Sequence, residues 1–203
     1  FAIVWHGDKL HGMSSSGWSP KALTYDYVKE KGYEKIPMGG WTSTTLPGCV
    51  RGWINLLEKF GTKTIEEVAQ PAIEAAEEGF CVTPYTADSM KKWFGILTST
   101  MDNEEMKENL KNFICYNGEF PKPGQLIKRP EMGRFLREVV ATKGEAVYGG
   151  DIAKAIVRES KKTGGLWEME DFAGFESVFH DPLSVNYRGY DICELPPNGQ
   201  GIT

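Results

Sequence analysis

Apolar and polar residues alternate at both ends of the chain, with the period of two that is typical of β-strands. Near the start, Phe1, Ile3 and Trp5 would share one face of a strand, and the Gly-Asp pair at 7–8 suits a tight turn into a second strand. Residues 183–196 alternate again on either side of an Arg-Gly pair. The pattern therefore predicts a β-hairpin at each end.

Between the hairpins, apolar residues recur at helical spacing. Ser19 followed by Pro20 has the form of an N-cap with proline in the first turn, which predicts a short helix ending at Gly32. A stretch rich in Gly, Pro and Thr follows and predicts a loop. The next helix carries an apolar stripe and ends at Gly61; the stripe consists of Val50, Trp53, Ile54, Leu57 and Phe60.

Capping signals mark the later helices. Thr64 and Glu67 form a capping-box pattern for a helix that ends at Gly79, and Pro71 is expected to break or restart it. Thr83, followed by proline, predicts the start of another helix. The remaining helical patterns cover 103–116, capped by Asp102, then 129–144, and then 151–165, capped by Asp151.

This β–helical–β order is consistent with an α+β fold in which both ends belong to one sheet covered by the helices. The chain has 203 residues, of which 40% are hydrophobic, enough for a sizeable core. Two hairpins, however, form too small a sheet for this much helix, and Phe1 begins in mid-strand. The chain is therefore expected to be incomplete at both ends.

Charge and composition argue against two classes of partner. The net charge is −5 and no Lys/Arg cluster is dense enough to neutralise phosphates, so a nucleic-acid partner is not expected. No apolar run approaches the roughly 20 residues that span a bilayer, and the start of the chain does not have the pattern of a signal peptide.

The cysteines predict neither a metal site nor a redox motif. Cys49, Cys81, Cys115 and Cys193 lie far apart in the sequence, without a C-x-x-C pair. They are interpreted as free thiols, which favours a reducing, cytoplasmic compartment.

Several short motifs contain residue types that occur in active sites. His6 and His11 flank the first turn, but no Asp, Glu or Cys at matching spacing completes a metal site, so surface or cross-strand histidines are the default interpretation. The SSSGWSP segment at 14–20 could hold a nucleophilic serine but lacks the G-x-S-x-G context, which favours a flexible loop. YGGDIA at 148–153 lacks the lysine of a P-loop. No metal or organic cofactor is implied.

The ELPPNGQG segment at 194–201 has the composition of a binding-site rim. Its prolines stiffen the entry, and its glycines let backbone amides approach a ligand closely. Asn198 and Gln200 add side-chain donors and acceptors. The alternative is that this loop only braces the sheet.

Several segments carry a resemblance to a known family. They include PGCVRGW and AAEEGF within 46–80, GEAVYGGDIAKAIV at 144–157, GGLWEMEDFAGF at 164–175 and PPNGQG near the end, after FAIVWHGDKLHGMSSSGWSP at 1–20. In this order they resemble the large subunit of the γ-glutamyltranspeptidase family, which belongs to the N-terminal-nucleophile hydrolases. Together they span nearly the whole chain.

The resemblance implies an αββα sandwich. Residues 1–18 would supply strands, 19–180 a mainly helical layer, and 183–203 strands and the site loop of a single domain. It also implies a precursor that cuts itself ahead of a threonine, whose free α-amine acts as the base for its own hydroxyl. The chain lacks the family's T-T-H-like context, and Thr203 follows the loop where the family continues into a helix.

The resemblance therefore places no catalytic residue in this chain, which is expected to be an interior part of the large subunit. The expected partners are a small-molecule amide substrate, the remaining large-subunit segments and the small subunit that carries the nucleophile. The candidate substrate-binding residues are Ser16, Gly17, Trp18, Asn198, Gly199 and Gln200.

Trp18 departs from the family pattern. It stands where the family's transpeptidases have an arginine that pairs with the α-carboxylate of the γ-glutamyl group. An indole offers one neutral donor and cannot form a two-pronged ion pair. Trp18 is therefore expected either to line a site for an apolar or aromatic acyl group, or to pack against the helical layer without touching substrate.

Three hypotheses follow from the resemblance. The first is a self-processed γ-glutamyltranspeptidase-like amidohydrolase or acyltransferase of γ-glutamyl or related acyl amides, as in glutathione metabolism. The second, favoured by Trp18, is a glutaryl- or cephalosporin-type acylase. The third is a non-catalytic binding protein that kept the fold.

Overall fold

The computed structural model describes residues 1–201, so the prediction about Thr203 falls outside the described part. Strands β1 (Ala2–His6) and β2 (Lys9–Ser14) form the predicted hairpin, in antiparallel register from Ala2–Met13 to His6–Lys9. Strand β5 (Val178–His180) pairs with the other edge of β2 and gives a three-stranded sheet. This strand lies at the end of the range predicted to be mainly helical, and the sequence pattern did not predict it.

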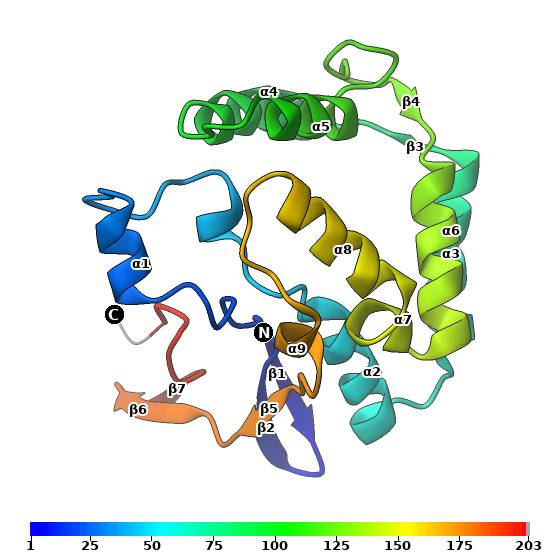
Figure 1. The fold of residues 1–203 in the computed structure, drawn as a ribbon. Helices are drawn as coiled ribbons and strands as arrows, with labels where there is room; N and C mark the ends of the chain where they lie inside the picture. The colour runs from blue at the N-terminus through cyan, green and yellow to red at the C-terminus, as the bar shows by residue number, and fades with distance from the viewer. Residues whose placement is uncertain (202–203) are drawn as a thin grey trace.

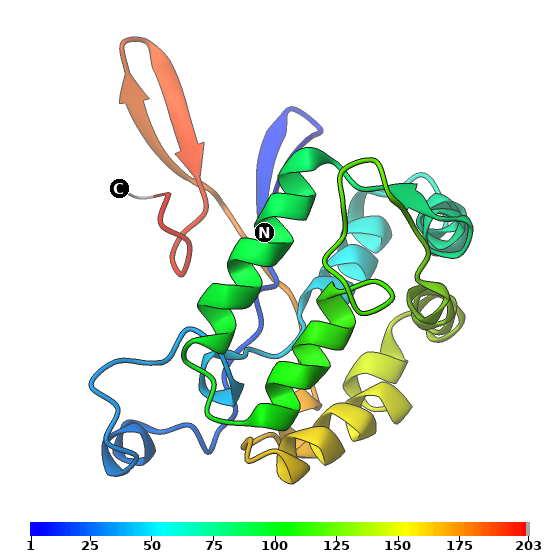
Figure 2. The same ribbon diagram turned by 90° about the horizontal axis from the view of Figure 1, so that it is seen from above.

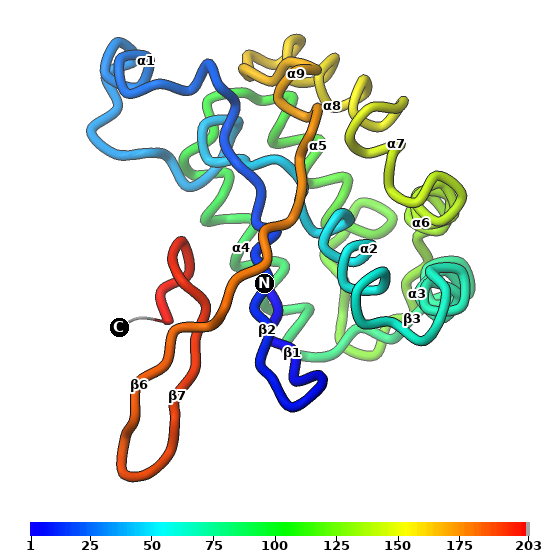
Figure 3. Tube along the Cα trace, turned by 90° about the horizontal axis from the view of Figure 1, so that it is seen from below, coloured from blue at the N-terminus to red at the C-terminus, as the bar shows by residue number. Residues whose placement is uncertain are grey.

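The second predicted hairpin is confirmed. Strands β6 (Leu183–Tyr187) and β7 (Tyr190–Glu194) pair on either side of the Arg-Gly turn. They form a separate two-stranded sheet, and the hairpin projects away from the helices in Figures 2 and 3. Both ends of the chain were expected to share one sheet. Strand β5 does join the sheet of β1 and β2, but the hairpin of β6 and β7 does not.

The helices occupy the middle of the chain, as predicted. They are α1 (Tyr25–Glu30), the 3-10 turn η1 (Trp41–Ser43), α2 (Cys49–Phe60), α3 (Ile65–Glu78), α4 (Pro84–Thr98), α5 (Glu104–Ile114), α6 (Pro130–Thr142), α7 (Glu145–Tyr148), α8 (Asp151–Lys162) and α9 (Met169–Phe172). Figure 1 shows α3 and α6 side by side, while α4 and α5 form a second pair beyond them. A short two-stranded sheet of β3 (Phe80–Cys81) and β4 (Leu126–Ile127) joins the two pairs. Within residues 1–201, every helix is too short or too polar to cross a membrane.

The capping rules predicted both ends of α3, the end of α2 and the start of α4. Thr64 and Glu67 form the full capping box of α3, and Thr83 accepts from the backbone N–H of Thr86 at the start of α4. Gly61 and Gly79 are the C-caps of α2 and α3, as expected.

Three predicted N-caps are corrected. The first helix is capped by Thr24, because the segment after Ser19 first makes a turn in which Leu23 donates to the carbonyl of Pro20. Asn103, one residue after the expected Asp102, caps α5 with its side-chain oxygen. Asp151 is the first residue of α8 and binds Lys154 of the same helix, so it does not cap.

Pro71 does not break α3, which runs unbroken from Ile65 to Glu78. The proline removes one backbone hydrogen bond on an exposed face of the helix. Packing offsets this loss: Ile73 and Ala76 are buried, and Arg137 of α6 makes two hydrogen bonds to the carboxylate of Glu77. Tertiary contacts therefore outweigh the local propensity.

The main core lies where α2, α6, α7, α8 and α9 meet. Its buried residues are Leu46, Val50, Val139, Val147, Tyr148, Ala153, Val157, Trp167, Phe172 and Phe175. The predicted stripe on α2 contributes Val50 to this core, and Ile54 is also buried, whereas Trp53 is 43% exposed. At the end of the stripe, the Phe60 ring contacts the rings of His6 and His11 and so ties α2 to the first hairpin.

Tyr148 connects the core to the start of α2. Its hydroxyl accepts from the backbone N–H of Arg51 and donates to the carbonyl of Pro47, both at 2.8 Å. The Arg51 guanidinium lies 4.6 Å from the centre of the ring. Burial raises the pKa of Tyr148 to about 12, although the nearby Arg51 groups favour the phenolate.

This pKa predicts an alkaline loss of stability. The folded state holds the phenol proton more tightly than the unfolded state, so the contribution is complete below pH 10 and disappears as the pH rises toward 12. Urea unfolding should show that the stability difference between the parent and Tyr148→Phe shrinks by about 2 kcal/mol between pH ~9 and pH ~11.5. The exposed Tyr187→Phe serves as the control. A Tyr148 difference that stays constant over this range would contradict the assignment.

Candidate functional site

The structure brings together the two segments predicted to be nearest to substrate. The side-chain amide of Asn198 donates to the hydroxyl oxygen of Ser16 at 3.2 Å, across 182 positions of sequence. The terminal loop therefore lies beside the turn that follows β2.

Leu195 anchors the terminal loop. It is 4% exposed, and its side chain occupies the space that a Cβ on Gly12 of β2 would need. Glycine at position 12 thus lets the loop approach the first sheet closely. The loop continues through two prolines to Asn198.

The turn at 15–18 rests on the segment just before α2. Buried Ser15 donates to the carbonyl of Gly48 at 2.7 Å and accepts from the hydroxyl of Ser177 at 2.9 Å. The backbone of Trp18 accepts from the N–H of Leu46 at 2.9 Å. These bonds tie the turn to the segment that leads into the core helix α2.

Gly17 has a conformation and a location that only glycine suits. Its φ is +81°, and a Cβ would overlap the carbonyl oxygen of Leu46. The Leu46 side chain is 1% exposed within the main core. The turn therefore lies directly on a rigid part of the backbone.

Trp18 combines packing with exposure. Its indole N–H donates to the carbonyl of Asp171 at 2.7 Å, and its ring meets Phe175 edge-on at 5.0 Å. The residue nevertheless remains 42% exposed. Trp18 thus packs against the helical layer on one side, and its placement in a substrate site stays a prediction.

The remaining candidates lie in the terminal loop. Gly199 has open space around the position of a Cβ, and Gln200 is exposed. Gly201 lies against Glu194, whose side chain a Cβ would displace. Asn198 is the residue through which this loop contacts the turn, and the substrate-binding role of the loop residues remains a prediction.

Sequence patterns missed part of this arrangement. Ser15, Ser177 and Asp171 support the turn, but they come from segments far apart in the chain. Their residue types occur equally in ordinary loops and caps. Only the tertiary contacts reveal their role.

The described residues show no metal centre. Residues 1–201 contain no group of at least three His, Cys, Asp or Glu side chains placed to hold an ion. The four cysteines are free, with Cys115 buried and the other three at least partly exposed.

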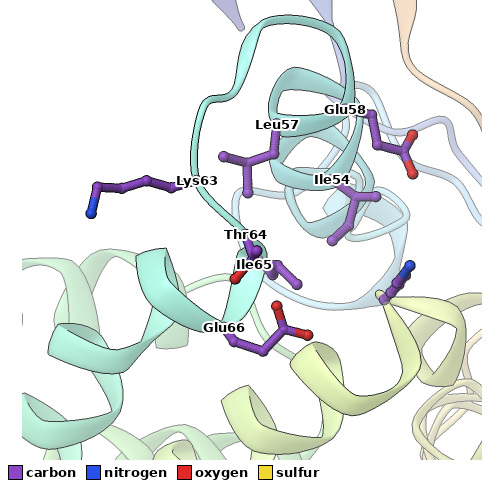
Figure 4. A pocket seen from close by; sticks show the side chains of 8 residues that line it. Ile54, Leu57, Glu58, Lys63, Thr64, Ile65 and Glu66 are labelled. Atoms are coloured by element: carbon purple, nitrogen blue, oxygen red, sulfur yellow. The ribbon is translucent and has the colours of Figure 1, made fainter.

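A cavity of about 250 Å³ lies apart from the predicted residues, between α2, the start of α3 and the end of α6 (Figure 4). Its lining residues are Ile54, Leu57, Glu58, Lys63, Thr64, Ile65, Glu66 and Lys143. In Figure 4 the Lys63 side chain points away from the others. None of these residues belongs to the turn or to the terminal loop.

Comparison with known proteins identifies the family. The family model for gamma-glutamyltranspeptidase matches residues 1–203. The chain belongs to the γ-glutamyltranspeptidase family. It is 32% identical to the glutathione hydrolase-like YwrD proenzyme of Bacillus subtilis over 94% of its length, and 33% identical to the glutathione hydrolase proenzyme of Escherichia coli over 76%.

A solved structure of a related acylase confirms the fold. The cephalosporin acylase of Bacillus halodurans is 34% identical and superimposes with a TM-score of 0.88 over 98% of the chain. The fold is the predicted α+β type of the N-terminal-nucleophile hydrolases, to which this chain contributes hairpins at both ends and a helical middle. The chain spans 35% of the Bacillus subtilis relative, 26% of the Escherichia coli relative and 37% of the acylase.

Gly17 provides a test of the turn. Gly17→Ala should lower the free energy of unfolding by about 2–4 kcal/mol, because it adds both positive-φ strain and overlap with Leu46. Gly164→Ala is the matched control, since Gly164 has φ +87° but open space, and should cost about 1 kcal/mol. Urea unfolding measures both values. Equal losses would show that the contact with Leu46 is not tight.

Proposed function

We propose that the protein is an amidohydrolase or acyltransferase that acts on γ-glutamyl or related acyl amides. Its nucleophile would be the N-terminal threonine of a self-processed precursor, outside residues 1–203. Family membership supports this proposal, as do relatives that are named glutathione hydrolase and acylase proenzymes.

The hydrogen bond between Ser16 and Asn198 is the observation that carries the proposal. Both segments were expected near substrate, and both lie on rigid supports: Gly17 on the Leu46 carbonyl, and Leu195 on β2. Pre-positioned polar groups of this kind bind a substrate without a large ordering cost. In this scheme, residues 1–201 hold the acyl amide while the threonine attacks its carbonyl.

The proposed partners are the remaining large-subunit segments and the small subunit that carries the threonine. The share of each relative's length that the chain covers supports this division. Exposed apolar side chains on the strands support it as well, because patches of this kind mark interaction surfaces. They include Phe1 just before β1, Ile3 and Trp5 on β1, and Val185, Tyr187, Tyr190 and Ile192 on the second hairpin.

A second candidate, a glutaryl- or cephalosporin-type acylase, is favoured by Trp18. Its indole N–H is bonded to the Asp171 carbonyl, so its exposed part offers an apolar ring to a substrate. Two similar proteins point the same way: the cephalosporin acylase, and the acylase ACY 1 proenzyme of Pseudomonas sp. SE83, which is 30% identical over 78% of the chain.

Activity of the whole protein on γ-glutamyl-anilide and glutaryl-anilide separates the two candidates. Cleavage of the γ-glutamyl compound alone supports a transpeptidase or glutathione hydrolase, and preference for the glutaryl compound supports an acylase. If the precursor processes itself but cleaves neither compound, both substrate proposals fail. If the sequence beyond residue 203 contains no Thr-Thr-His-like site, a non-catalytic binding protein is favoured.

Substitution of Trp18 tests its role in selectivity. Trp18→Arg should raise kcat/KM for γ-glutamyl-anilide relative to glutaryl-anilide by about 10- to 100-fold, because a charge-assisted hydrogen bond is worth about 1.5–3 kcal/mol. Trp18→Phe keeps a ring against Phe175 and should leave the ratio within about threefold. An unchanged ratio in a stable Trp18→Arg protein would show that position 18 does not contact the acyl group.

A further inference from the structure

Asp171 is a buried carboxylate in the short helix α9. It is 3% exposed, and among the acidic and basic residues of 1–201 it is the one that is fully buried. Removing a carboxylate from water costs several kcal/mol unless hydrogen bonds replace the lost hydration. Its partners therefore indicate what the residue does.

Those partners lie in the segment from Trp18 to Lys21 and at Glu168, just before α9. Oδ1 accepts from the backbone N–H of Lys21, and Oδ2 accepts from the backbone N–H of Glu168, each at 3.0 Å. The main-chain carbonyl of Asp171 accepts the indole N–H of Trp18 at 2.7 Å. One residue thus holds both ends of the segment from Trp18 to Lys21, about 150 positions earlier in the chain.

The helix that carries Asp171 is itself fixed in the core. Phe172, the next residue, is 0% exposed, and its ring lies 5.3 Å from that of buried Trp167. Phe175, at the end of the same segment, supports the Trp18 ring from its edge. Trp18 is therefore held by an acceptor and a ring that are both fixed in the core, while 42% of the residue remains exposed.

We infer that Asp171 is a positioning residue that sets the pose of Trp18 and so controls binding of the acyl group. The inference rests on the proposed function and adds a residue that does not itself touch substrate. Because the indole N–H is bonded to the main-chain carbonyl of Asp171, Trp18 offers an apolar ring and no free donor to the acyl group. Asparagine at position 171 could accept only one of the two backbone N–H groups, since its amide nitrogen would face the other. The turn would then shift relative to α9.

Kinetics of the whole processed protein test the inference. With the better of the two anilides, Asp171→Asn should raise KM about tenfold while kcat stays within about threefold, since only the pose of the acyl group changes. Glu170→Gln, an exposed neighbour on the same helix, is the matched control and should behave as the parent. In a Trp18→Ala background, Asp171→Asn should have no further effect on KM.

Two kinetic outcomes would overturn the inference. One is an unchanged KM in a folded Asp171→Asn protein. The other is the same KM increase in the parent and in the Trp18→Ala background, which would mean that Asp171 acts on the fold and not through Trp18.

A spectroscopic measurement separates this inference from the proposed function. In protein labelled with ¹⁵N-tryptophan, the Trp18 indole signal is identified by its loss in Trp18→Phe. Asp171→Asn should shift this signal and speed its exchange with water, whereas Glu170→Gln should not. If the parent cleaves neither anilide, the proposed function fails, and a shifted signal still supports the positioning role. If the parent is active and the signal is unmoved, the inference fails and the proposed function stands.

Discussion

The candidate site depends on the close approach of Gly17 to the carbonyl of Leu46. No side chain fits between them, so the turn after β2 rests directly on backbone that belongs to the main core. Hydrogen bonds from Ser15 and Leu46 then fix the turn on either side. Interiors pack densely and deform little, so this contact transmits the rigidity of the core to a turn with an exposed side.

A row of aromatic contacts links the same turn to the helices. Trp18 meets Phe175 edge-on, Phe175 stacks on Tyr148 at 5.7 Å, and Arg51 lies over the Tyr148 ring. Arg51 also donates to the carbonyl of Phe175 at 3.2 Å, which closes the row back onto the segment after α9. Each contact contributes little, but together they place one exposed ring on a buried support. Such an arrangement suits a substrate-facing residue whose orientation has to be reproducible.

Local rules predicted the elements well because local physics sets their ends. The capping box at Thr64 and the glycine stop at Gly79 need only neighbouring residues, and the structure contains both. Pro71 was mispredicted because its cost is local while the packing of α3 on α6 is not. Strand β5 was missed for a similar reason: three residues have no clear period, and only pairing with β2 makes them a strand.

Only the resemblance to the family predicted that the two segments of the candidate site lie near one another. On local evidence residues 14–20 looked like a flexible loop, whereas the terminal loop had the composition of a binding-site rim. Their meeting across the whole chain leaves no trace in spacing or composition. The supporting role of Asp171 was likewise invisible, since an aspartate in the first turn of a helix is ordinary.

A double-mutant cycle between Ser16 and Asn198 tests most directly whether these two segments form one site. The measured quantity is kcat/KM of the whole protein for its better anilide, in Ser16→Ala, in Asn198→Ala and in the double variant. If the two side chains act through their mutual hydrogen bond, the double variant should lose no more kcat/KM than the more impaired of the two single variants. The coupling energy should be about 0.5–1.5 kcal/mol. Losses that simply multiply would mean that the turn and the loop act independently, which would contradict the joint site described here.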